Sequence, residues 1–366
     1  MKKLILLLIV TLSIGNIKGQ SKADPVKVAV IGLTHTHVHW ILGREDLGDI
    51  EIIGIVEPNK DLASRYAKQH GYSMDMVYES MEALMANKSP EAVTAFGTIY
   101  DHLAVVEFFA PKGIHVMVEK PLAVSFKHAE KMKRLAEKHN IHLLTNYETT
   151  WYGSNFKAYE MVHHDKTIGE IRKIVVHDGH RGPKEIGVNE EFLEWLTDPV
   201  LNGAGALTDF GCYGANLATW LMKGERPESV FALAQTNKPD LYPKVDDDAT
   251  IVLKYPKTQV IIQASWNWPV SRKDMEVYGE NGQIIADNGS TLRYKLGDDH
   301  KEVTLTELKK SSPLDDPFSL LAGVVRGTIK PLPTDLSALE NNMIVMEILE
   351  AAKKSVASGK LVKLKN

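Results

Sequence analysis

The chain has 366 residues, 44% of them hydrophobic and 25% charged, and this length predicts two domains, because it exceeds what one ordinary core supports. A formal net charge of −4 gives no electrostatic reason to expect binding to nucleic acid or to an anionic membrane. A single cysteine, Cys212, excludes an internal disulfide framework and a zinc cluster built on cysteines.

Residues 1–20 are predicted to be a secretory signal peptide that is not part of the fold. Lys2 and Lys3 form a short basic segment, residues 4–14 are an apolar run, and small or polar residues follow up to Gln20. The alternative is an uncleaved membrane anchor, for which this apolar run is short. We therefore expect an exported protein, periplasmic or secreted, with no membrane insertion after cleavage.

Residues 25–146 show the alternation of strands and helices that is typical of a Rossmann dinucleotide-binding domain. Residues 26–31 are rich in β-branched side chains and end at Gly32, as expected of a buried parallel strand. Further strands are expected at residues 50–56, 92–96, 114–118 and 141–144, with helices at 61–70, 102–110 and 127–138. Such repeated units predict a doubly wound parallel sheet, which binds ligands at the carboxyl ends of its strands.

The turn after the first strand predicts a phosphate-binding loop of unusual sequence. A dinucleotide fingerprint has three glycines, and their positions here hold Gly32, Thr34 and His37. Backbone N–H groups at the helix start can still bind a pyrophosphate, and Thr34, His35 and His37 can add side-chain donors. Glu57 closes the second strand, where a carboxylate accepts hydrogen bonds from ribose hydroxyls and repels a 2′-phosphate. This pattern predicts NAD in preference to NADP.

His35, His37 and His39 also suggest a metal site. Alternate residues share a face only in an extended segment, and here a helix is expected to start, in which they point about 200° apart. No carboxylate ligand accompanies them locally. We therefore predict no metal and assign the histidines to phosphate binding or to structural hydrogen bonds.

Residues 147–366 are predicted to form a second α/β domain for substrate binding and oligomerisation. Short successive strands with little helix between them predict a large open, mostly antiparallel sheet. The expected strands are 172–178, 229–234, 249–255, 259–266, 274–278 and 283–286, with helices at 155–164 and 190–196. A C-terminal helix at residues 336–358 carries an apolar stripe and can pack back on the first domain.

Lys120 is the first candidate catalytic residue. It ends a predicted parallel strand, and Pro121 fixes the turn after it. An ammonium at this place can contact both the nicotinamide ribose and a substrate hydroxyl, and partial desolvation is expected to lower its pKa toward a value useful for proton transfer. A solvated lysine at a helix start fits the same pattern.

A glycine-rich loop opens the helix that carries the second candidate group. Asp209 and Tyr213 lie one turn apart on one face, so the first can orient a sugar hydroxyl while the second exchanges its proton. A nearby lysine is expected to favour the phenolate of Tyr213 by lowering its pKa. Helix capping and core packing fit this spacing as well.

The irregular stretch 180–185 and a late strand contain candidate substrate contacts. His180 and Arg181 can bind substrate from the irregular stretch, although basic loop residues are usually just solvated. Trp266 and Trp268 alternate in a strand, so at most one of them can stack on a sugar ring.

Taken together, these stretches resemble the Gfo/Idh/MocA family of sugar oxidoreductases. The resemblance runs from about residue 26 to the C-terminus and is carried by the Rossmann-like start and by segments 119–123, 209–213 and 277–282. It implies a Rossmann domain followed by an α/β domain with a large open sheet, often used for homo-oligomerisation. It also implies NAD(P)-dependent oxidation or reduction of sugars, inositols or related polyols.

The resemblance also assigns site residues. Lys120 matches the family's catalytic lysine, and Tyr213 stands where many members have a catalytic histidine, which implies a tyrosine-bearing branch. Asn216 occupies a place where aspartate is common. The expected catalytic residues are Lys120, Tyr213 and Asp209, and the expected substrate contacts are His180, Arg181, Asp209 and Asn216. The expected cofactor contacts are Gly32, Thr34, His35, His37, Glu57, Thr98, Glu119, Lys120 and Pro121.

The expected function is hydride transfer between a nicotinamide cofactor and a hydroxyl or ketone of a sugar, glycoside or polyol. Free NAD is scarce outside the cytoplasm, so export predicts a tightly bound cofactor that is reset within each cycle. Two alternatives are a redox-assisted glycosidase, which oxidises a glycoside, eliminates its aglycone and reduces the product again, and a non-catalytic sugar-binding protein.

Overall fold

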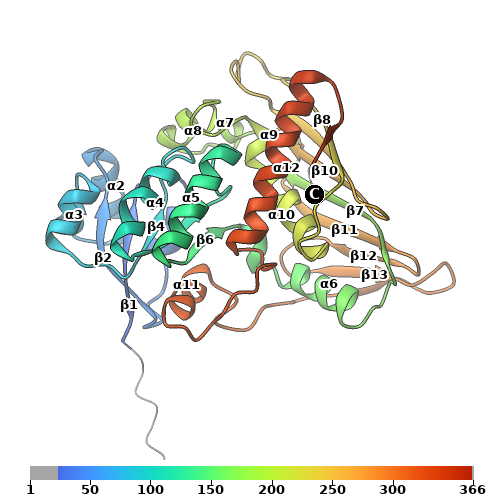
Figure 1. Ribbon diagram of the computed structural model, residues 1–366, viewed down its shortest axis with the longest axis horizontal. Helices are drawn as coiled ribbons and strands as arrows, with labels where there is room; N and C mark the ends of the chain where they lie inside the picture. Colours follow the sequence, from blue (N-terminus) through green and yellow to red (C-terminus); the bar gives the residue numbers. More distant parts are fainter. Residues whose placement is uncertain (1–23, 365–366) are drawn as a thin grey trace, which may run out of the picture.

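The computed structural model describes residues 24–364 and shows two domains side by side (Figure 1). The first contains a six-stranded parallel sheet in the order β3-β2-β1-β4-β5-β6. Its strands are β1 Val26–Ile31, β2 Ile50–Val56, β3 Val77–Tyr78, β4 Ala92–Ala95, β5 His115–Glu119 and β6 Leu143–Asn146. Its helices are α1 Val38–Leu42, α2 Lys60–His70, α3 Met81–Asn87, α4 His102–Phe109 and α5 Phe126–His139.

The first β-strand shows why this sheet is buried and why it turns where it does. Within β1 only Lys27 is exposed, because the other side chains are apolar and are covered on both faces of the sheet. Gly32 follows with φ of +79°, and a Cβ there would lie 2.7 Å from the backbone nitrogen of Gly97. Only glycine allows this turn, which brings the loop after β1 close to the end of β4.

The second domain contains a nine-stranded sheet in the order β14-β13-β12-β11-β7-β10-β9-β8-β15. Among its described strands only β7 and β10 run parallel; the other neighbours are antiparallel. The strands are β7 Ile171–Gly179, β8 Ser229–Gln235, β9 Asp248–Lys254, β10 Gln259–Ser265, β11 Arg272–Gly279, β12 Gln283–Ala286, β13 Leu292–Lys295, β14 Val303–Leu305 and β15 Val362–Lys363. The predicted α/β class, with a parallel sheet followed by a large, mostly antiparallel one, is confirmed.

Helices cover one face of the large sheet (Figure 1). They are α6 Gly153–His163, α9 Ala206–Asp209, α10 Gly211–Leu221 and α12 Leu339–Ser358, and the short helices α7 Pro183–Ile186 and α8 Glu190–Leu196 follow β7. A Cβ at Gly214 would lie 2.4 Å from Cγ2 of Ile262, so glycine lets α10 approach β10 closely. In α12, the Lys353 ammonium donates to the carbonyl of Val124 at 2.8 Å, so this C-terminal helix contacts both domains.

Helix α11, Pro317–Val325, departs from the expected domain boundary. Its apolar side chains, including Phe318 and Leu321, belong to the core of the first domain, although the sequence pattern assigned everything after residue 146 to the second. Arg44 reaches Asp316 at 2.8 Å, and the Ser319 hydroxyl donates to Asp49 at 2.6 Å. The chain therefore returns to the Rossmann domain before it forms α12.

The predicted signal peptide, residues 1–20, lies outside the described residues and stays a prediction. Between residues 24 and 364, no helix has the length and apolar character needed to cross a membrane.

Candidate active site

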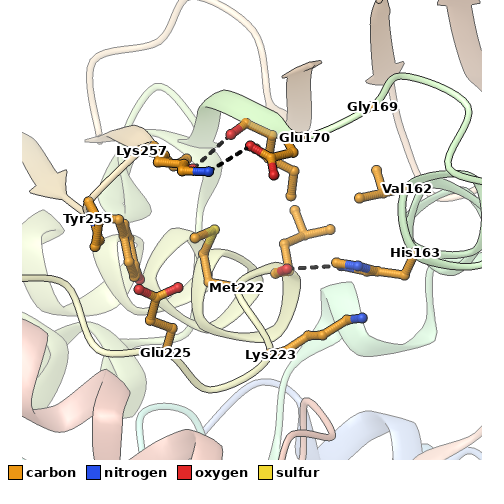
Figure 2. A pocket seen from close by; sticks show the side chains of 13 residues that line it. Val162, His163, Gly169, Glu170, Met222, Lys223, Glu225, Tyr255 and Lys257 are labelled. Atoms are coloured by element: carbon orange, nitrogen blue, oxygen red, sulfur yellow. Dashed lines mark hydrogen bonds and ion pairs between the residues drawn. The ribbon is translucent and has the colours of Figure 1, made fainter. Parts of the chain in front are cut away.

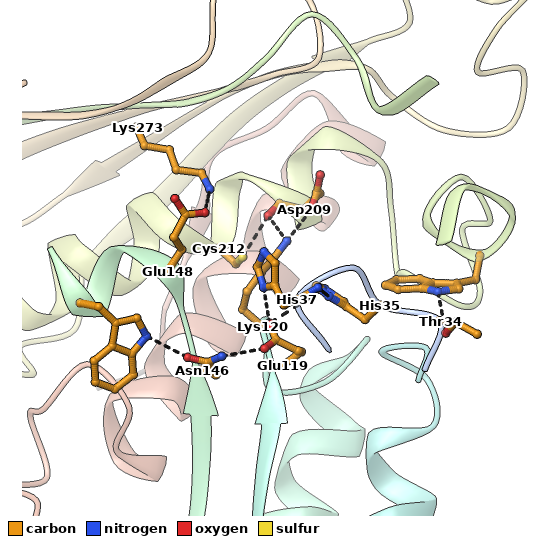
Figure 3. A network of polar contacts seen from close by, with 12 residues as sticks. Thr34, His35, His37, Glu119, Lys120, Asn146, Glu148, Asp209, Cys212 and Lys273 are labelled. Carbon is orange, nitrogen blue, oxygen red and sulfur yellow. Dashed lines mark hydrogen bonds and ion pairs between the residues drawn. The ribbon is translucent and has the colours of Figure 1, made fainter. Parts of the chain in front are cut away.

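The candidate active site lies where the carboxyl ends of β1, β5 and β6 meet helices α9 and α10 (Figure 3). Lys120 and Glu119 come from the end of β5, His35 and His37 from the loop after β1, and Asp209 from the end of α9. Carboxyl ends of parallel strands converge at one edge, so residues distant in sequence meet here. The peptide between Lys120 and Pro121 is cis.

Lys120 and Asp209 form a buried ion pair. The Lys120 ammonium lies 2.5 Å from Oδ1 of Asp209 and 3.2 Å from its backbone carbonyl, and Trp266 donates its indole N–H to Oδ2 at 3.0 Å. Burial by itself lowers the pKa of Lys120, but the charge of Asp209 outweighs it, and the pKa is raised. The expectation of a lowered lysine pKa is therefore wrong, because the structure supplies a carboxylate partner that the sequence pattern did not place. Lys120 is a fixed cationic donor.

Tyr213 lies one turn after Asp209, beside two ammonium groups. Its ring centre is 5.1 Å from the Lys120 ammonium and 5.0 Å from that of Lys273. Burial, followed by the charge of Glu148, nevertheless raises the pKa of Tyr213 well above its usual value. The expected phenolate is therefore wrong, since desolvation outweighs the nearby cations. Tyr213 keeps its proton and can donate it.

Glu119 organises the floor of the site (Figure 3). One carboxylate oxygen lies 2.8 Å from Nδ1 of His37, and the other accepts the amide N–H of Asn146 at 2.7 Å. Asn146 in turn accepts the indole N–H of Trp151 at 3.0 Å. This chain of bonds fixes the carboxylate beside Lys120, and burial raises the pKa of Glu119.

The histidines do not follow the helical geometry expected from the sequence. Because α1 begins only at Val38, His35 and His37 lie in the preceding loop, and their ring nitrogens come within 4.8 Å of each other and of a carboxylate oxygen of Glu119. The backbone N–H of His37 donates to Nδ1 of His35 at 3.1 Å. Burial, followed by the charge of His37, lowers the pKa of His35, so the neutral ring carries its proton on Nε2.

This tautomer matters for the choice between a metal and a dinucleotide. A metal needs a lone pair on Nε2 of His35, but that atom bears the proton and is a donor. It is buried, without a partner among residues 24–364, and 3.9 Å from Glu119. His39 lies apart, 2.8 Å from Nε2 of His70. The absence of a metal stays a prediction, and the His35 N–H fits a cofactor oxygen.

The phosphate-binding loop retains donors for a dinucleotide. Thr34 N and Thr36 N have no hydrogen bond to another described residue, and both precede the first turn of α1. The Glu57 carboxylate, at the end of β2, accepts the N–H groups of Leu33 at 2.9 Å and Asn59 at 2.8 Å. The loop after β1, the start of α1 and the Glu57 carboxylate therefore fit the binding of a nicotinamide dinucleotide.

Two other expected cofactor contacts are engaged with the protein. The Thr34 hydroxyl accepts the indole N–H of Trp195 from α8 at 3.1 Å, and the Thr98 hydroxyl donates to Asp101 at 2.7 Å. The backbone N–H of Thr34 is thus a more direct donor to a cofactor than its hydroxyl, whereas the backbone N–H of Thr98 also donates to Asp101, at 3.3 Å.

The residues expected to contact the substrate have different surroundings in the structure. His180 lies against the edge of Phe210 at 5.0 Å and accepts the N–H of Gly182 on Nδ1 at 3.0 Å. Burial, opposed by the charge of Asp209, lowers the pKa of His180 to about 4, so it presents a neutral Nε2–H donor. Arg181 is exposed. Asn216 is fully buried and donates to the carbonyl of Leu336, so its expected substrate contact is wrong, because its face of α10 packs toward α12.

Trp266, which the sequence suggested as a residue that can stack on a sugar ring, is not available for such stacking. Its side chain is fully buried, and its ring packs against Tyr242 with centres 4.9 Å apart. The indole N–H is committed to Asp209 at 3.0 Å. Trp266 therefore orients the carboxylate of Asp209 and offers no face to a sugar.

A separate hollow lies beside the far end of α10 and has a different character (Figure 2). It has a volume of about 440 Å³ and is lined by residues such as His163, Glu170 and Lys257. His163 bonds to the carbonyl of Leu221 at 2.9 Å, and Lys257 donates to Glu170 at 3.2 Å. Because these polar groups satisfy one another, the hollow does not compete with the Lys120 cluster as a reaction centre.

Two family models match the chain. Residues 26–147 match the oxidoreductase family with an NAD-binding Rossmann fold, and residues 156–285 match the GFO/IDH/MocA C-terminal domain. Together these matches cover more than half of the chain. The chain belongs to the GFO/IDH/MocA family of oxidoreductases.

Relatives in this family include dehydrogenases of a diol, of inositols and of a sugar, and two of them, a scyllo-inositol 2-dehydrogenase and a D-xylose 1-dehydrogenase, are named for NADP⁺. The trans-1,2-dihydrobenzene-1,2-diol dehydrogenase of Xenopus tropicalis is 28% identical over 223 residues, which span 59% of this chain and 61% of the relative's length. The myo-inositol 2-dehydrogenase of Thermotoga maritima is 22% identical over 349 residues, which span 93% of this chain and 98% of that one.

Solved structures of similar proteins support the fold. The aldose-aldose oxidoreductase of Caulobacter crescentus, complexed with glycerol, has a TM-score of 0.79 at 21% identity and covers 93% of this chain and 100% of its own. An inositol dehydrogenase homologue of Azotobacter vinelandii, complexed with NAD⁺, has a TM-score of 0.80 at 17% identity and covers 93% of this chain and 98% of its own.

The structure also adds residues that sequence reasoning missed in this family member. Lys273 of β11 forms an ion pair with Glu148 in the short helix Glu148–Trp151, and Tyr152 donates to Glu148 at 2.6 Å. Asp178, the next-to-last residue of β7, lies opposite Lys273 in the sheet. The only available signal was alternation within β7 and β11, which predicts a shared face but not which helix covers it.

Proposed function

We propose that this protein transfers a hydride between a nicotinamide cofactor and a hydroxyl or ketone of a sugar, glycoside or polyol. The observation that carries the proposal is the buried pair of Lys120 and Asp209 beside the phenol of Tyr213. A fixed cation and a proton-bearing phenol at the carboxyl end of a Rossmann strand suit the chemistry of a carbonyl oxygen.

Because Lys120 is charged and Tyr213 holds its proton, the proposed reaction is best described in the direction of ketone reduction. Lys120 donates a hydrogen bond to the substrate oxygen and stabilises negative charge on it, while Asp209 keeps the ammonium in place. Tyr213 gives its proton to the same oxygen, and in oxidation the proton returns to it. A bound nicotinamide supplies or accepts the hydride. His180 adds a neutral N–H donor at the edge of the site.

Glu57 supports NAD over NADP as the cofactor. Its carboxylate lies at the end of β2, where the adenosine ribose of a dinucleotide binds in Rossmann domains, and it already accepts two backbone N–H groups. A 2′-phosphate placed beside this carboxylate would meet another negative charge.

Contacts between the domains support a tightly held cofactor. Asn189 donates to the Tyr66 hydroxyl at 2.7 Å, Glu191 pairs with Arg65 at 2.7 Å, and Trp195 binds Thr34. These residues lie in α8 or directly before it, and they contact α2 and the phosphate-binding loop. The second domain therefore covers the side of the first domain at which a dinucleotide is expected to bind. Such closure slows cofactor exchange, because these contacts must break before release.

A retained cofactor, together with the signal peptide predicted at residues 1–20, supports action outside the cytoplasm. We also propose a homo-oligomer, because the helices of residues 24–364 cover one face of the large sheet and leave the other face uncovered. Retention keeps the redox-assisted glycosidase as the second candidate. Incubation with a nitrophenyl glycoside and no added NAD separates the two activities: release of nitrophenol supports the glycosidase, and a keto-sugar alone supports simple dehydrogenation.

The decisive experiment is mass spectrometry of ligand released from the purified protein by denaturation, followed by turnover of a panel of sugars and cyclitols with NAD⁺ and NADP⁺. We expect released NAD(H) and turnover that Lys120→Met abolishes. A protein without bound nucleotide and without NAD affinity by calorimetry would instead be a sugar-binding protein.

A further inference from the structure

Asp178 is a buried carboxyl group without a partner. It lies near the end of β7, has no exposed surface, and neither of its oxygens has a hydrogen bond within residues 24–364. Buried carboxyl groups are almost always bonded, since leaving one unpaired costs free energy. An unpaired carboxyl therefore requires an explanation.

The strand register places Asp178 in the active site. It lies opposite Lys273 of β11 and opposite Ala264 of β10, so these three side chains share one face of the sheet. On this face the Lys273 ammonium is 5.0 Å from the ring centre of Tyr213. His177 and Asp274, the neighbouring residues, pair with each other at 2.9 Å on the opposite face.

The charged groups around Asp178 are already matched with one another. Lys120 pairs with Asp209, and Lys273 pairs with Glu148. Burial raises the pKa of Asp178 well above its usual range, and the cations Lys273 and Lys120 reduce this rise without cancelling it. The charges of Asp274 and Glu148 add to it. Burial therefore favours the protonated form of Asp178, and this carboxyl has no hydrogen-bond partner among residues 24–364.

We propose that Asp178 binds the hydroxyl group next to the reacting one, so that the site selects vicinal diols. The inference rests on the proposed function, which places the reacting oxygen between Lys120 and Tyr213. A carboxylic acid offers one donor and one acceptor, and a neighbouring hydroxyl offers the same pair in return. A substrate with a single hydroxyl leaves Asp178 unpaired, and a site built to bond a hydroxyl discriminates strongly against an analogue that lacks it.

Asp178→Ala tests this inference because it removes both hydrogen-bonding groups, with Asp274→Ala as the matched control on the opposite face of the same strand pair. The probes are trans-cyclohexane-1,2-diol and cyclohexanol, titrated into nucleotide-loaded protein by calorimetry and, where turnover occurs, compared by kcat/KM. The wild type should prefer the diol by about 10- to 100-fold. Asp178→Ala should lose most of this preference, whereas Asp178→Asn, whose amide also offers a donor and an acceptor, and Asp274→Ala should keep it. All three variants should bind NADH as the wild type does.

A stability measurement separates a ligand role from a structural one. Because the folded protein raises the pKa of Asp178, the ionised form is disfavoured, and this residue lowers stability as pH rises above about 3.9. Asp178→Ala, which removes the unpaired buried group, should therefore unfold no more easily than the wild type at neutral pH. Marked destabilisation of Asp178→Ala, or a diol preference that survives in this variant, overturns the inference.

Equal binding of the two probes by the wild type also overturns the inference. The proposed function stands in that case if other sugars are turned over with dependence on Lys120. Conversely, a diol preference without any turnover supports the role of Asp178 and counts against the proposed reaction.

Discussion

Asp209→Asn is the sharpest test of the ion pair that defines the site. The substitution keeps the shape of the side chain and its ability to accept the Trp266 N–H, but it removes the negative charge 2.5 Å from Lys120. Both side chains of the pair are 5% exposed, so water cannot replace the lost partner. Removing one member of a buried pair typically costs about 3–5 kcal/mol, mainly through the unpaired charge that remains.

The magnitude can be checked by urea unfolding at neutral pH against an exposed pair in the same protein. Lys131 and Glu107 form an ion pair with side chains 52% and 39% exposed, and Glu107→Gln should cost less than about 1 kcal/mol. Asp209→Asn should lose several times more. The double variant Lys120→Met with Asp209→Asn should recover part of that loss, because no unpaired charge is left.

The pH dependence of the same variant gives an independent check. In the wild type the pKa of Lys120 is raised, so its contribution to stability is present below the ordinary lysine value of about 10.4 and is lost above it. Without Asp209, burial dominates and lowers the pKa, so the stability of the variant should rise with pH toward about 10.4. An Asp209→Asn protein as stable as Glu107→Gln, with no such rise, would refute the reasoning.

Three further predictions concern other parts of the structure. Tyr213→Phe should lower kcat by about 10²- to 10⁴-fold with little change in cofactor affinity, because it removes only the transferable proton, and steady-state kinetics with NADH titration would show this. Trp195→Phe should release NAD(H) faster than the wild type, since the bond to Thr34 is lost, and unchanged retention during gel filtration would contradict the closure. The Arg44 hydrogen bonds, opposed by burial, lower the pKa of Asp49 to about 2, so the stability from this pair is present above about 4 and is lost between about 4 and 2. Asp49→Asn should flatten the stability profile in that interval, as acid unfolding followed by circular dichroism would record.

The sequence by itself determined the parallel sheet of the first domain and the place of its ligand edge. β-branched runs that end at Gly32 and Lys120 repeat the strand–helix unit, and such units close in one handedness only. The spacing of Asp209 and Tyr213 was also sufficient to place both on one helical turn. These are local properties, because they depend on periodicity and on backbone geometry within short segments.

The tertiary structure decided which groups meet and which of them keep their protons. The pKa directions of Lys120 and Tyr213 were predicted wrongly from the sequence, because each depends on the balance between burial and a charge carried by a distant segment. The approach of Asp178 and Lys273 depends on the register between β7 and β11, which no local pattern specifies. Long-range packing, through desolvation and strand register, therefore converts a predictable scaffold into a particular site.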